Sequence, residues 1–315
     1  MKTLLAITLP ILLLILYFVV PEQKNNPEKA PQPPREEAEK PGMPSPETLV
    51  SLAPDPAAAI PGEPARIIIR GVASLSDIES LTFDDKPVPV FSDESGMAAL
   101  VGIDFHKKPG SYPLVLTLDD SRIFKENLEV KPRVVATAEF DIPEQLGGNT
   151  PKAEHELTAT LSTDSSVLDS VTAKVNPEQL WSGPFRLPLG GDPMVTDTYG
   201  YSRKTGSVSL SHLGTDFRAA EGTPVHAINS GEVAYTGTLR NFGKTVIIDH
   251  GLGIMTMYMH LSEIGVEAGD NVGKGDPVAK SGNTGYSLGP HLHLSVRIGG
   301  FSIDPMKFLE LMGPK

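Results

Sequence analysis

Short apolar runs that alternate with polar residues and end at turn residues recur from about residue 60 onward, and this pattern predicts a mainly β fold. Between residues 60 and 133 the runs recur at intervals of roughly 8–15 residues, which is typical of a small antiparallel β-sandwich with an immunoglobulin-like shape. The candidate strands are residues 66–70, 81–83, 97–101, 112–118 and 128–130. The chain has no Cys, so this prediction depends on the pattern alone and not on a disulfide pin.

Glycine becomes frequent towards the C-terminus and predicts a second, tightly turned domain over residues 182–315. This region holds 22 of the 30 glycines and six of the eight histidines. Its apolar runs predict the strands of an antiparallel sheet at residues 224–228, 231–239, 245–250, 255–261, 278–280 and 291–298. Only residues 306–311, after Asp304-Pro305, have a helical pattern.

Residues 134–181 connect these two regions and are predicted to be partly helical. Apolar residues recur near helical spacing and a proline follows that would end the helix: Leu157, Leu161, Leu168, Val171, Val175 and then Pro177. We expect this connector to pack against the domain that follows it. His106 in the sandwich has no ligand-like neighbour, and His155 in the connector stands among charged residues, so we expect both to be surface residues.

The N-terminus has the pattern of a membrane segment. Residues 4–20 form an apolar run interrupted only by Thr8 and Pro10, and as a helix these 17 residues would rise about 25 Å, slightly less than the hydrocarbon thickness of a bilayer. Lys2 on the short side predicts a cytoplasmic N-terminus and an exported remainder. Because no small-residue cleavage site follows the run, we expect residues 1–20 to be an uncleaved signal anchor, with a cleaved signal peptide as the alternative.

Residues 21–59 have the composition of a disordered linker. They contain ten prolines, many Glu and Lys residues and no aromatic side chain, so they can bury little apolar surface. The sequence therefore predicts a single-pass protein of the inner or cytoplasmic membrane. Its folded part would lie on the periplasmic or other extracytoplasmic side, at a distance from the bilayer.

Charge and residue content exclude several functions. The chain has 27 Lys and Arg against 39 Asp and Glu, a formal net charge of −12, so it has no basic excess for binding nucleic acid. The absence of Cys excludes a thiol nucleophile and a Cys-ligated metal. The sequence also lacks a G-x-S-x-G elbow and a P-loop, which leaves the histidines as candidates for chemistry.

Two histidines near the C-terminus stand two residues apart. On a strand, the side chains of His291 and His293 point to the same face, and those of Leu292, Leu294 and Val296 point to the other. Two adjacent imidazoles could bind a metal or exchange protons, although a solvated strand face that carries two histidines by chance has the same pattern.

A second segment supplies the remaining groups of a candidate metal site. His212 and Asp216 stand four residues apart, and Gly214 between them would let the backbone bend so that both reach one ion. With His293 they would give two nitrogens and one oxygen. Three protein ligands with an open fourth position are typical of catalytic zinc, so the set indicates metal-assisted hydrolysis.

His260 and His291 are left over as candidates for proton transfer. Strand alternation predicts that His260 lies on the same face as Tyr258. A lone histidine of this kind is more often structural than catalytic.

Beyond the histidines, several motifs of residues 185–309 occur in a characteristic order and spacing: Tyr199-Gly200-Tyr201-Ser202-Arg203, His212 to Asp216, Gly222-Thr223-Pro224-Val225, Gly231-Glu232-Val233, residues 246–251, Tyr258-Met259-His260-Leu261, and Thr284-Gly285 through Gly289-Pro290-His291-Leu292-His293. With these motifs the region resembles the lysostaphin-type zinc endopeptidases, also called LytM-domain peptidases, which cut peptide cross-links in bacterial peptidoglycan. The upstream sandwich and connector look like accessory regions of membrane-anchored relatives.

The resemblance implies one Zn²⁺ per chain and a role for each histidine. Zinc would be held by His212, Asp216 and His293, and His260 and His291 would act as general base and as stabilisers of the tetrahedral intermediate. His250 would be structural, and His226 would not be a ligand. Two departures from the family pattern, Ser287-Leu288-Gly289-Pro290 and Leu294-Ser295, would alter loop packing and the hydrogen bonds that orient the metal ligands.

The resemblance implies an endopeptidase that hydrolyses peptidoglycan cross-links with metal-activated water and takes stem peptides or cross-bridges as its substrate. The alternative is a LytM-type scaffold without catalysis that binds the cell wall or activates an amidase. A third possibility is an active site that residues 134–181 hold shut until a regulatory protein partner or processing opens it. The sequence leaves open which cross-link is cut.

Overall fold

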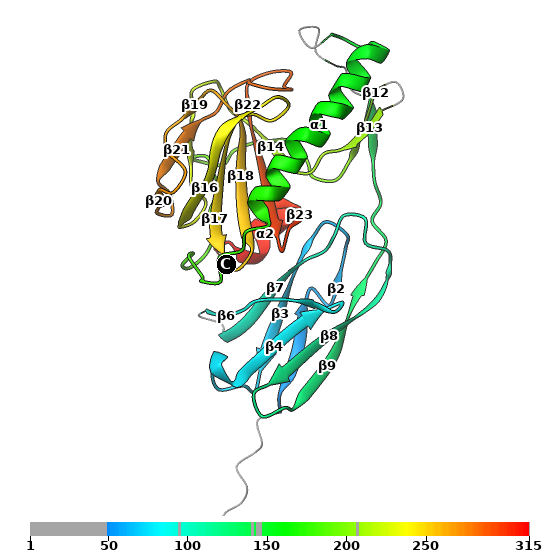
Figure 1. The fold of residues 1–315 in the computed structure, drawn as a ribbon, viewed down its shortest axis with the longest axis vertical. Coiled ribbons are helices and arrows are strands. Elements are labelled where there is room, and N and C mark those ends of the chain that lie inside the picture. Colours follow the sequence, from blue (N-terminus) through cyan, green and yellow to red (C-terminus); the bar gives the residue numbers. More distant parts are fainter. Residues whose placement is uncertain (1–48, 94–95, 140–141, 143–146, 206–207, 315) are drawn as a thin grey trace, which may run out of the picture. The chain divides into compact units, whose positions relative to one another are not determined.

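The computed structural model describes residues 49–93, 96–139, 142, 147–205 and 208–314 (Figure 1). These residues form a mainly β fold, as predicted, with two α-helices and one 3-10 turn at Leu75–Asp77. No helix within these ranges is long and apolar enough to cross a membrane. The predicted signal anchor at residues 1–20 and most of the predicted linker lie outside the described residues.

The first folded region is a sandwich of two sheets with strand orders β1-β3-β7-β6 and β2-β9-β8-β4-β5. Its strands are β1 (Ser51–Asp55), β2 (Ala58–Ala59), β3 (Pro64–Arg70), β4 (Ile78–Phe83), β5 (Lys86–Pro87), β6 (Val90–Asp93), β7 (Gly96–Gly102), β8 (Gly110–Leu118) and β9 (Ile123–Val130). Ile67 and Val101 on one sheet and Leu81 and Leu116 on the other share one buried core. Each strand expected from the pattern lies within an observed strand, and the immunoglobulin-like shape stays a prediction.

The prediction of a disordered linker is wrong in its last residues, 51–59. Strand β1 pairs with β3, and β2 pairs with β9. Both short strands lie at the edges of their sheets, where a proline such as Pro54 interrupts no central hydrogen-bond ladder. A high proline content therefore does not exclude strands here.

Strand β7 lies between two hydrophobic cores. Ala99 and Val101 point into the sandwich, whereas Ala98 and Leu100, together with Phe91 on β6, belong to the core of the C-terminal region. There Phe91 packs edge-on against Trp181, with ring centroids 5.3 Å apart. Strand β7 is thus buried on both faces along most of its length.

The C-terminal region is built on one large, mostly antiparallel sheet of order β11-β14-β22-β18-β17-β16-β20, with β23 paired to β22. Two three-stranded sheets, β15-β21-β19 and β10-β12-β13, flank it. The elements are β10 (Thr137–Glu139), β11 (Val195–Asp197), β12 (Ser202–Thr205), β13 (Val208–Ser211), β14 (Thr215–Arg218), β15 (Pro224–His226), β16 (Gly231–Leu239), β17 (Gly243–Gly251), β18 (Ile254–Leu261), β19 (Glu263–Ile264), β20 (Asn271–Val272), β21 (Pro277–Lys280), β22 (His291–Ile298), β23 (Phe301–Ile303) and helix α2 (Pro305–Met312).

The predicted strands and terminal helix of this region agree with these elements. The exception is the strand expected at residues 224–228, which ends at His226, where its register with β21 shifts. On β22, Leu292, Leu294 and Val296 are fully buried in the core, as alternation predicts.

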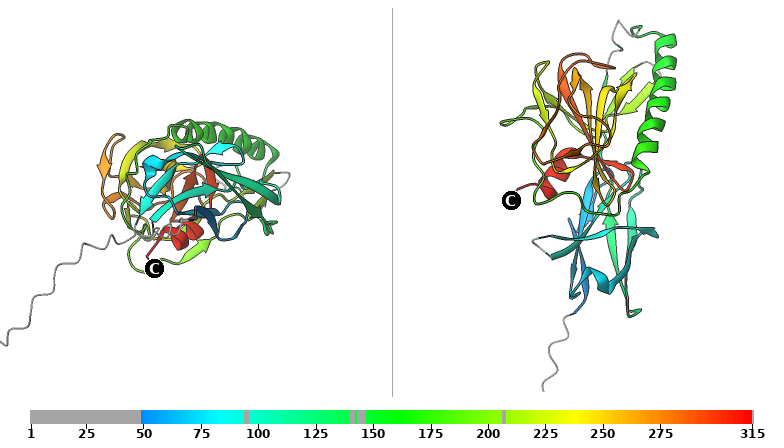
Figure 2. Two further views of the ribbon diagram at one scale, coloured as in Figure 1. Left: turned by 90° about the horizontal axis from the view of Figure 1, so that it is seen from below. Right: turned by 60° about the vertical axis from the view of Figure 1, so that its left-hand side comes forward.

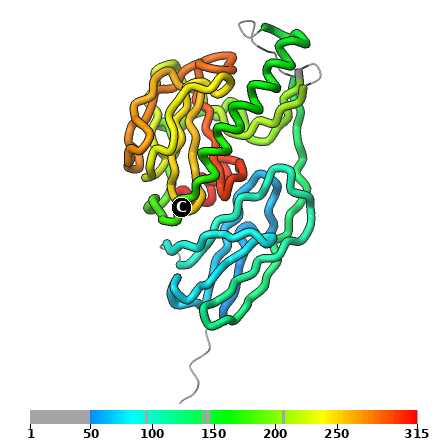
Figure 3. Tube along the Cα trace, viewed as in Figure 1, coloured from blue at the N-terminus to red at the C-terminus, as the bar shows by residue number. Residues whose placement is uncertain are grey.

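Helix α1 (Pro151–Thr172) is the helical part of the connector and packs against the large sheet, as expected (Figures 1 and 2). Its Leu168 belongs to a second apolar cluster together with the methionines of β18. The helix ends at Thr172, before Val175, which is 51% exposed, so the expected extension towards Pro177 does not form. Figure 3 traces the chain from the sandwich through α1 into the large sheet.

Candidate metal centre

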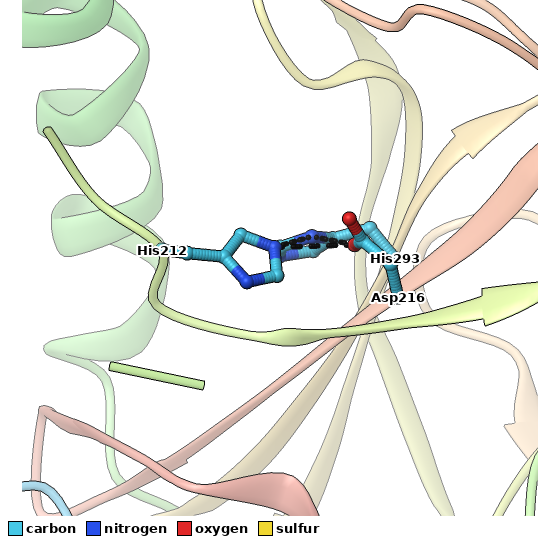
Figure 4. A group of neighbouring side chains, drawn as sticks. All are labelled: His212, Asp216 and His293. Carbon is cyan, nitrogen blue, oxygen red and sulfur yellow. Dashed lines mark hydrogen bonds and ion pairs between the residues drawn. The ribbon is translucent and has the colours of Figure 1, made fainter. Parts of the chain in front are cut away.

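Strand pairing brings Asp216 and His293 together. They are direct partners in the antiparallel ladder between β14 and β22, so their side chains share one face of the sheet. His212 follows β13, and the turn through Gly214 brings it beside them (Figure 4). A Cβ atom on Gly214 would lie 2.2 Å from Nε2 of His293, so only glycine fits this turn.

The three side chains converge on one point. Oδ1 of Asp216 lies 2.7 Å from Nδ1 of His293 and 3.2 Å from Nε2 of His212, and the two nitrogens lie 3.2 Å apart. Ligands bound at about 2.0–2.1 Å around a tetrahedral zinc would be separated by about 3.3 Å. All three residues are buried.

Hydrogen bonds on the outer side of each imidazole determine where its proton lies. Nδ1 of His212 lies 2.8 Å from the carbonyl oxygen of Thr198, which can only accept, so Nδ1 carries the proton and Nε2 presents its lone pair. The hydroxyl of Ser295 donates to the carbonyl oxygen of Leu213 and therefore accepts from Nε2 of His293, at 3.0 Å. Nδ1 of His293 is thus also a free lone pair.

The protonation states match those that bind metals. Burial alone raises the pKa of Asp216, but His293 and His212 beside it hold this pKa well below its usual range, and the carboxylate is ionised. Burial also lowers the pKa of His293 and favours a neutral ring. Two nitrogen lone pairs and a carboxylate oxygen then face one another with no proton between them, and a cation relieves this repulsion. The residues fit a divalent metal.

His260 and His291 stand beside this group. Their ring centroids are 4.8 Å apart, and the ring of His260 lies 5.8 Å from that of His293. Nδ1 of His260 donates to the carbonyl oxygen of Thr284 and Nδ1 of His291 to that of Gly289, each at 2.8 Å, so Nε2 of each ring carries no proton. Nε2 of His291 lies 3.8 Å from Oδ1 of Asp216. Burial, and then the neighbouring histidines, lowers the pKa of His260 to about 3.

The prediction that His260 shares a face with Tyr258 is wrong. Lys244 of β17 pairs with Leu261 of β18, and Val246 pairs with Tyr258, so β18 has one extra residue in this interval and forms a β-bulge. His260 lies in the bulge and has a φ of 59°. Tyr258 points into the core, where its hydroxyl accepts a hydrogen bond from the backbone N–H of Ile228. The bulge turns His260 to the face that carries His293.

Arg203, which lies in a recognised motif but was assigned no role, contacts the metal group. Its Nη2 lies 3.3 Å from Oδ2 of Asp216 and also pairs with Asp197, and its Nε donates to the hydroxyl of Tyr201. It therefore holds the outer oxygen of Asp216. The spacing of Arg203 and Asp216 along the sequence gave no indication of this contact. The position of Ser295 beside His293 could have been predicted, because residues two apart on a strand share a face.

The other histidines lie outside the group. His250 is fully buried and bonds to the carbonyl oxygen of Ser230 and the hydroxyl of Thr256, and Nδ1 of His226 bonds to the carbonyl oxygen of Gly275. His106 and His155 are exposed, as expected.

Comparison with known proteins gives a consistent result. Residues 210–305 match Peptidase family M23, which confirms the resemblance to lysostaphin-type peptidases. An uncharacterized metalloprotease of Haemophilus influenzae is 40% identical over 135 residues, which cover 41% of this chain and 28% of that protein. Peptidoglycan DD-endopeptidase ShyA of Vibrio cholerae is 43% identical over 96 residues, which cover 30% of this chain and 22% of ShyA. The chain thus matches about a quarter of the length of these relatives.

The fold also matches a solved structure. A crystal structure of a candidate peptidase M23 from Pseudomonas aeruginosa superimposes with a TM-score of 0.57 at 26% identity. The superposition covers 79% of this chain and 94% of that one, and so extends well beyond the family match.

Proposed function

Because this chain carries a peptidase family M23 domain, we propose that it is a zinc endopeptidase that hydrolyses peptide cross-links of peptidoglycan. One observation carries the proposal: two imidazole lone pairs and one carboxylate oxygen converge beside two further imidazoles with free nitrogens. A relative over the same domain is named as a peptidoglycan DD-endopeptidase.

In this proposal His212, Asp216 and His293 hold the zinc. When bound, zinc would polarise the scissile carbonyl and lower the pKa of water. The free Nε2 of His260 or His291 accepts the proton of the attacking water and returns it to the departing amine, and the protonated ring stabilises the negative charge that develops on the carbonyl oxygen. Bonds from Nδ1 of each ring to backbone carbonyls keep these nitrogens pointing inward.

The scaffold alternative is weaker. A domain that only binds the wall or activates an amidase has no need for two neutral imidazoles and an ionised carboxylate held within 3.2 Å of one another. We propose that the N-terminal segment anchors the chain in the membrane, which would place the domain on the wall side.

The position of α1 favours the third possibility, in which the connector limits access to the site. Met259 on β18 is opposite His293 on β22, so the methionines that α1 covers share a face with the metal group. Near its N-terminus, Ala153 and Leu157 belong to an apolar cluster that packs against Leu210, two residues before His212, and against Tyr286, in the loop that supports His291. The helix thus contacts segments adjoining both His212 and His291.

The proposed activity is tested on intact sacculi. Purified protein is incubated with sacculi with and without a chelator, and the released muropeptides are identified by mass spectrometry. We expect zinc-dependent loss of cross-linked species, its absence in His293→Ala, and no change in His155→Ala, a matched substitution of an exposed histidine. Asp164 on α1 accepts hydrogen bonds from the backbone N–H and the side-chain Nδ2 of Asn241, and the Asp164→Ala variant, which removes them to release α1, is assayed in parallel.

The outcomes separate the candidates. Activity only in Asp164→Ala would favour a site that α1 closes. Zinc binding without any change in cross-linking, in either form, would favour the scaffold.

A further inference from the structure

The sandwich carries a cavity of about 280 Å³ on the side where its β4–β5 hairpin faces β23. Its wall combines two aromatic rings, a glycine backbone and five ionisable side chains: Phe83, Asp84, Lys86, Gly102, Asp104, His106, Lys107 and Phe301. None of these residues belongs to the metal group.

Half of the charged groups in the cavity are already paired. Lys107 forms an ion pair with Asp84, and its ammonium lies 3.9 Å from the ring centroid of Tyr112 and 5.4 Å from that of Phe83. These contacts fix Lys107 in the wall, so it is not the group that would bind a ligand.

The other charged groups are available. The ammonium of Lys86 lies 4.9 Å from the ring centroid of Phe301, and among the described residues it has no ion-pair or hydrogen-bond partner. Oδ1 of Asp104 accepts the backbone N–H of His106, whereas its Oδ2 has no partner within the described part of the chain. The cavity therefore presents one free cation and one free carboxylate oxygen.

The backbone that holds the Lys86 side of the cavity has an uncommon conformation. Asp84 and Asp85 form the two-residue turn between β4 and β5, and both have positive φ, 50° and 61°. Asp is among the residues that tolerate positive φ at the first position of such a turn, whereas glycine is favoured at the second, where Asp85 stands. The turn places the Asp84–Lys107 pair next to Lys86 in the wall of the cavity.

We propose that this cavity binds the zwitterionic end of an amino acid, a carboxylate and an ammonium on one carbon. The carboxylate contacts Lys86, the ammonium contacts Oδ2 of Asp104, and the carbon chain lies against Phe301. Asp84 balances Lys107 in the wall, and Lys86 and Asp104 carry one charge of each sign, which disfavours a ligand of net charge such as a phosphate.

The source of this ligand, unlike the binding site itself, rests on the proposed function. Hydrolysis of a cross-link made through the side-chain amine of a diamino dicarboxylic acid breaks the amide C–N bond. The oxygen of water is bonded to the carbonyl carbon, which becomes a carboxylate, and the released nitrogen takes up protons to become an ammonium on the carbon that already carries a free carboxylate. The cavity would then hold the end that the reaction generates, away from the metal group.

Calorimetric titration of the purified full chain with meso-diaminopimelate tests the site. We expect saturable binding, at least tenfold weaker binding in Lys86→Gln and in Asp104→Asn, and unchanged binding in Lys125→Gln, an exposed lysine on β9 outside the cavity. Asp104→Asn keeps an oxygen for the N–H of His106 and so preserves the local turn. Acetate and ethylamine, which each supply one of the two charges, should bind at least tenfold more weakly.

The same titration on metal-free protein and on His293→Ala separates this site from the metal group. Retained binding supports the cavity whether or not the protein proves to be a peptidase. Binding that disappears in His293→Ala, that is unaffected by both cavity substitutions, or that is absent in the wild type would overturn the proposal.

Discussion

Replacing Asp164 with alanine should release α1 from the sheet. The carboxylate of Asp164 is buried and accepts the backbone N–H of Asn241 at 2.7 Å and its side-chain Nδ2 at 2.8 Å. These two bonds link the middle of the helix to the β16–β17 turn across 77 residues of sequence. No other carboxylate of α1 is buried to this degree.

The loss of docking free energy in Asp164→Ala can be worked out from these contacts. A hydrogen bond to a charged group contributes about 1.5–3 kcal/mol, and the substitution also leaves two donors of a buried Asn241 unsatisfied. The docked form should lose at least about 3 kcal/mol, which corresponds to a shift of about a hundredfold in the opening equilibrium.

The sequence of α1 adds little intrinsic stability against this loss. Several of its hydroxyls bond back to carbonyls of the preceding turn instead of supporting helix formation: Thr158, Thr160, Thr163, Ser166 and Ser170.

Amide hydrogen exchange measured by mass spectrometry on peptides of residues 151–172 is the direct assay. Asp164→Ala should speed this exchange by about two orders of magnitude. Asp169→Ala is the matched control, because Asp169 pairs with Arg297 but its side chain is 68% exposed, and such a pair contributes about 0–1 kcal/mol. Equal exchange in the two variants would refute the view that Asp164 holds the helix. Faster exchange without increased release of muropeptides would refute α1 as a barrier.

Three further outcomes are expected. Gly214→Ala should reduce metal content at least tenfold, measured by elemental mass spectrometry, because its Cβ would lie 2.2 Å from Nε2 of His293; unchanged metal content would contradict the site geometry. Ser295→Ala should weaken zinc affinity by about 10–100-fold in a competition titration, because Nε2 of His293 loses its acceptor; an unchanged affinity would show that the ring needs no such support. Burial lowers the pKa of His250 from 6.5 to about 4. Because the unfolded chain therefore takes up this proton at a higher pH than the folded chain, the free energy of unfolding should fall by about 3 kcal/mol as the pH falls from 6.5 towards 4. The Tm of the wild type should fall over this range more steeply than that of His250→Gln, and parallel curves would contradict the assignment.

The strands were predictable because they depend on local pattern. The convergence of His212 and Asp216 with His293 depends on the pairing of β14 with β22, and it was predicted from the ligand types and from motifs shared with a known family. Alternation determined which side of β22 carries His293 and which side carries Leu292 and Leu294. The turn at Gly214 needed only the recognition that glycine permits a close approach.

The features that escaped prediction depend on pairing between distant segments. The bulge that turns His260 towards His293 exists only in the register between β17 and β18, and alternation along one strand cannot reveal it. The contact between Arg203 and Asp216 and the bond from Asp164 to Asn241 likewise join segments that no local pattern connects. Proline-rich edge strands were missed for a related reason, because a strand's position in its sheet decides whether proline is tolerated.

The four imidazoles differ in whether the group that accepts their outer N–H belongs to the backbone or to a side chain, and this affects how the site can vary. His212, His260 and His291 donate to backbone carbonyls, which persist whatever side chains those loops carry. His291 also has the hydroxyl of Ser287 3.2 Å from Nδ1, whereas the outer nitrogen of His293 has only a side-chain partner, the hydroxyl of Ser295. Since the hydroxyl is neutral, it raises the basicity of the ring less than a carboxylate at the same place would. The position of Ser295 is therefore where a single substitution can tune metal affinity while every ligand is preserved.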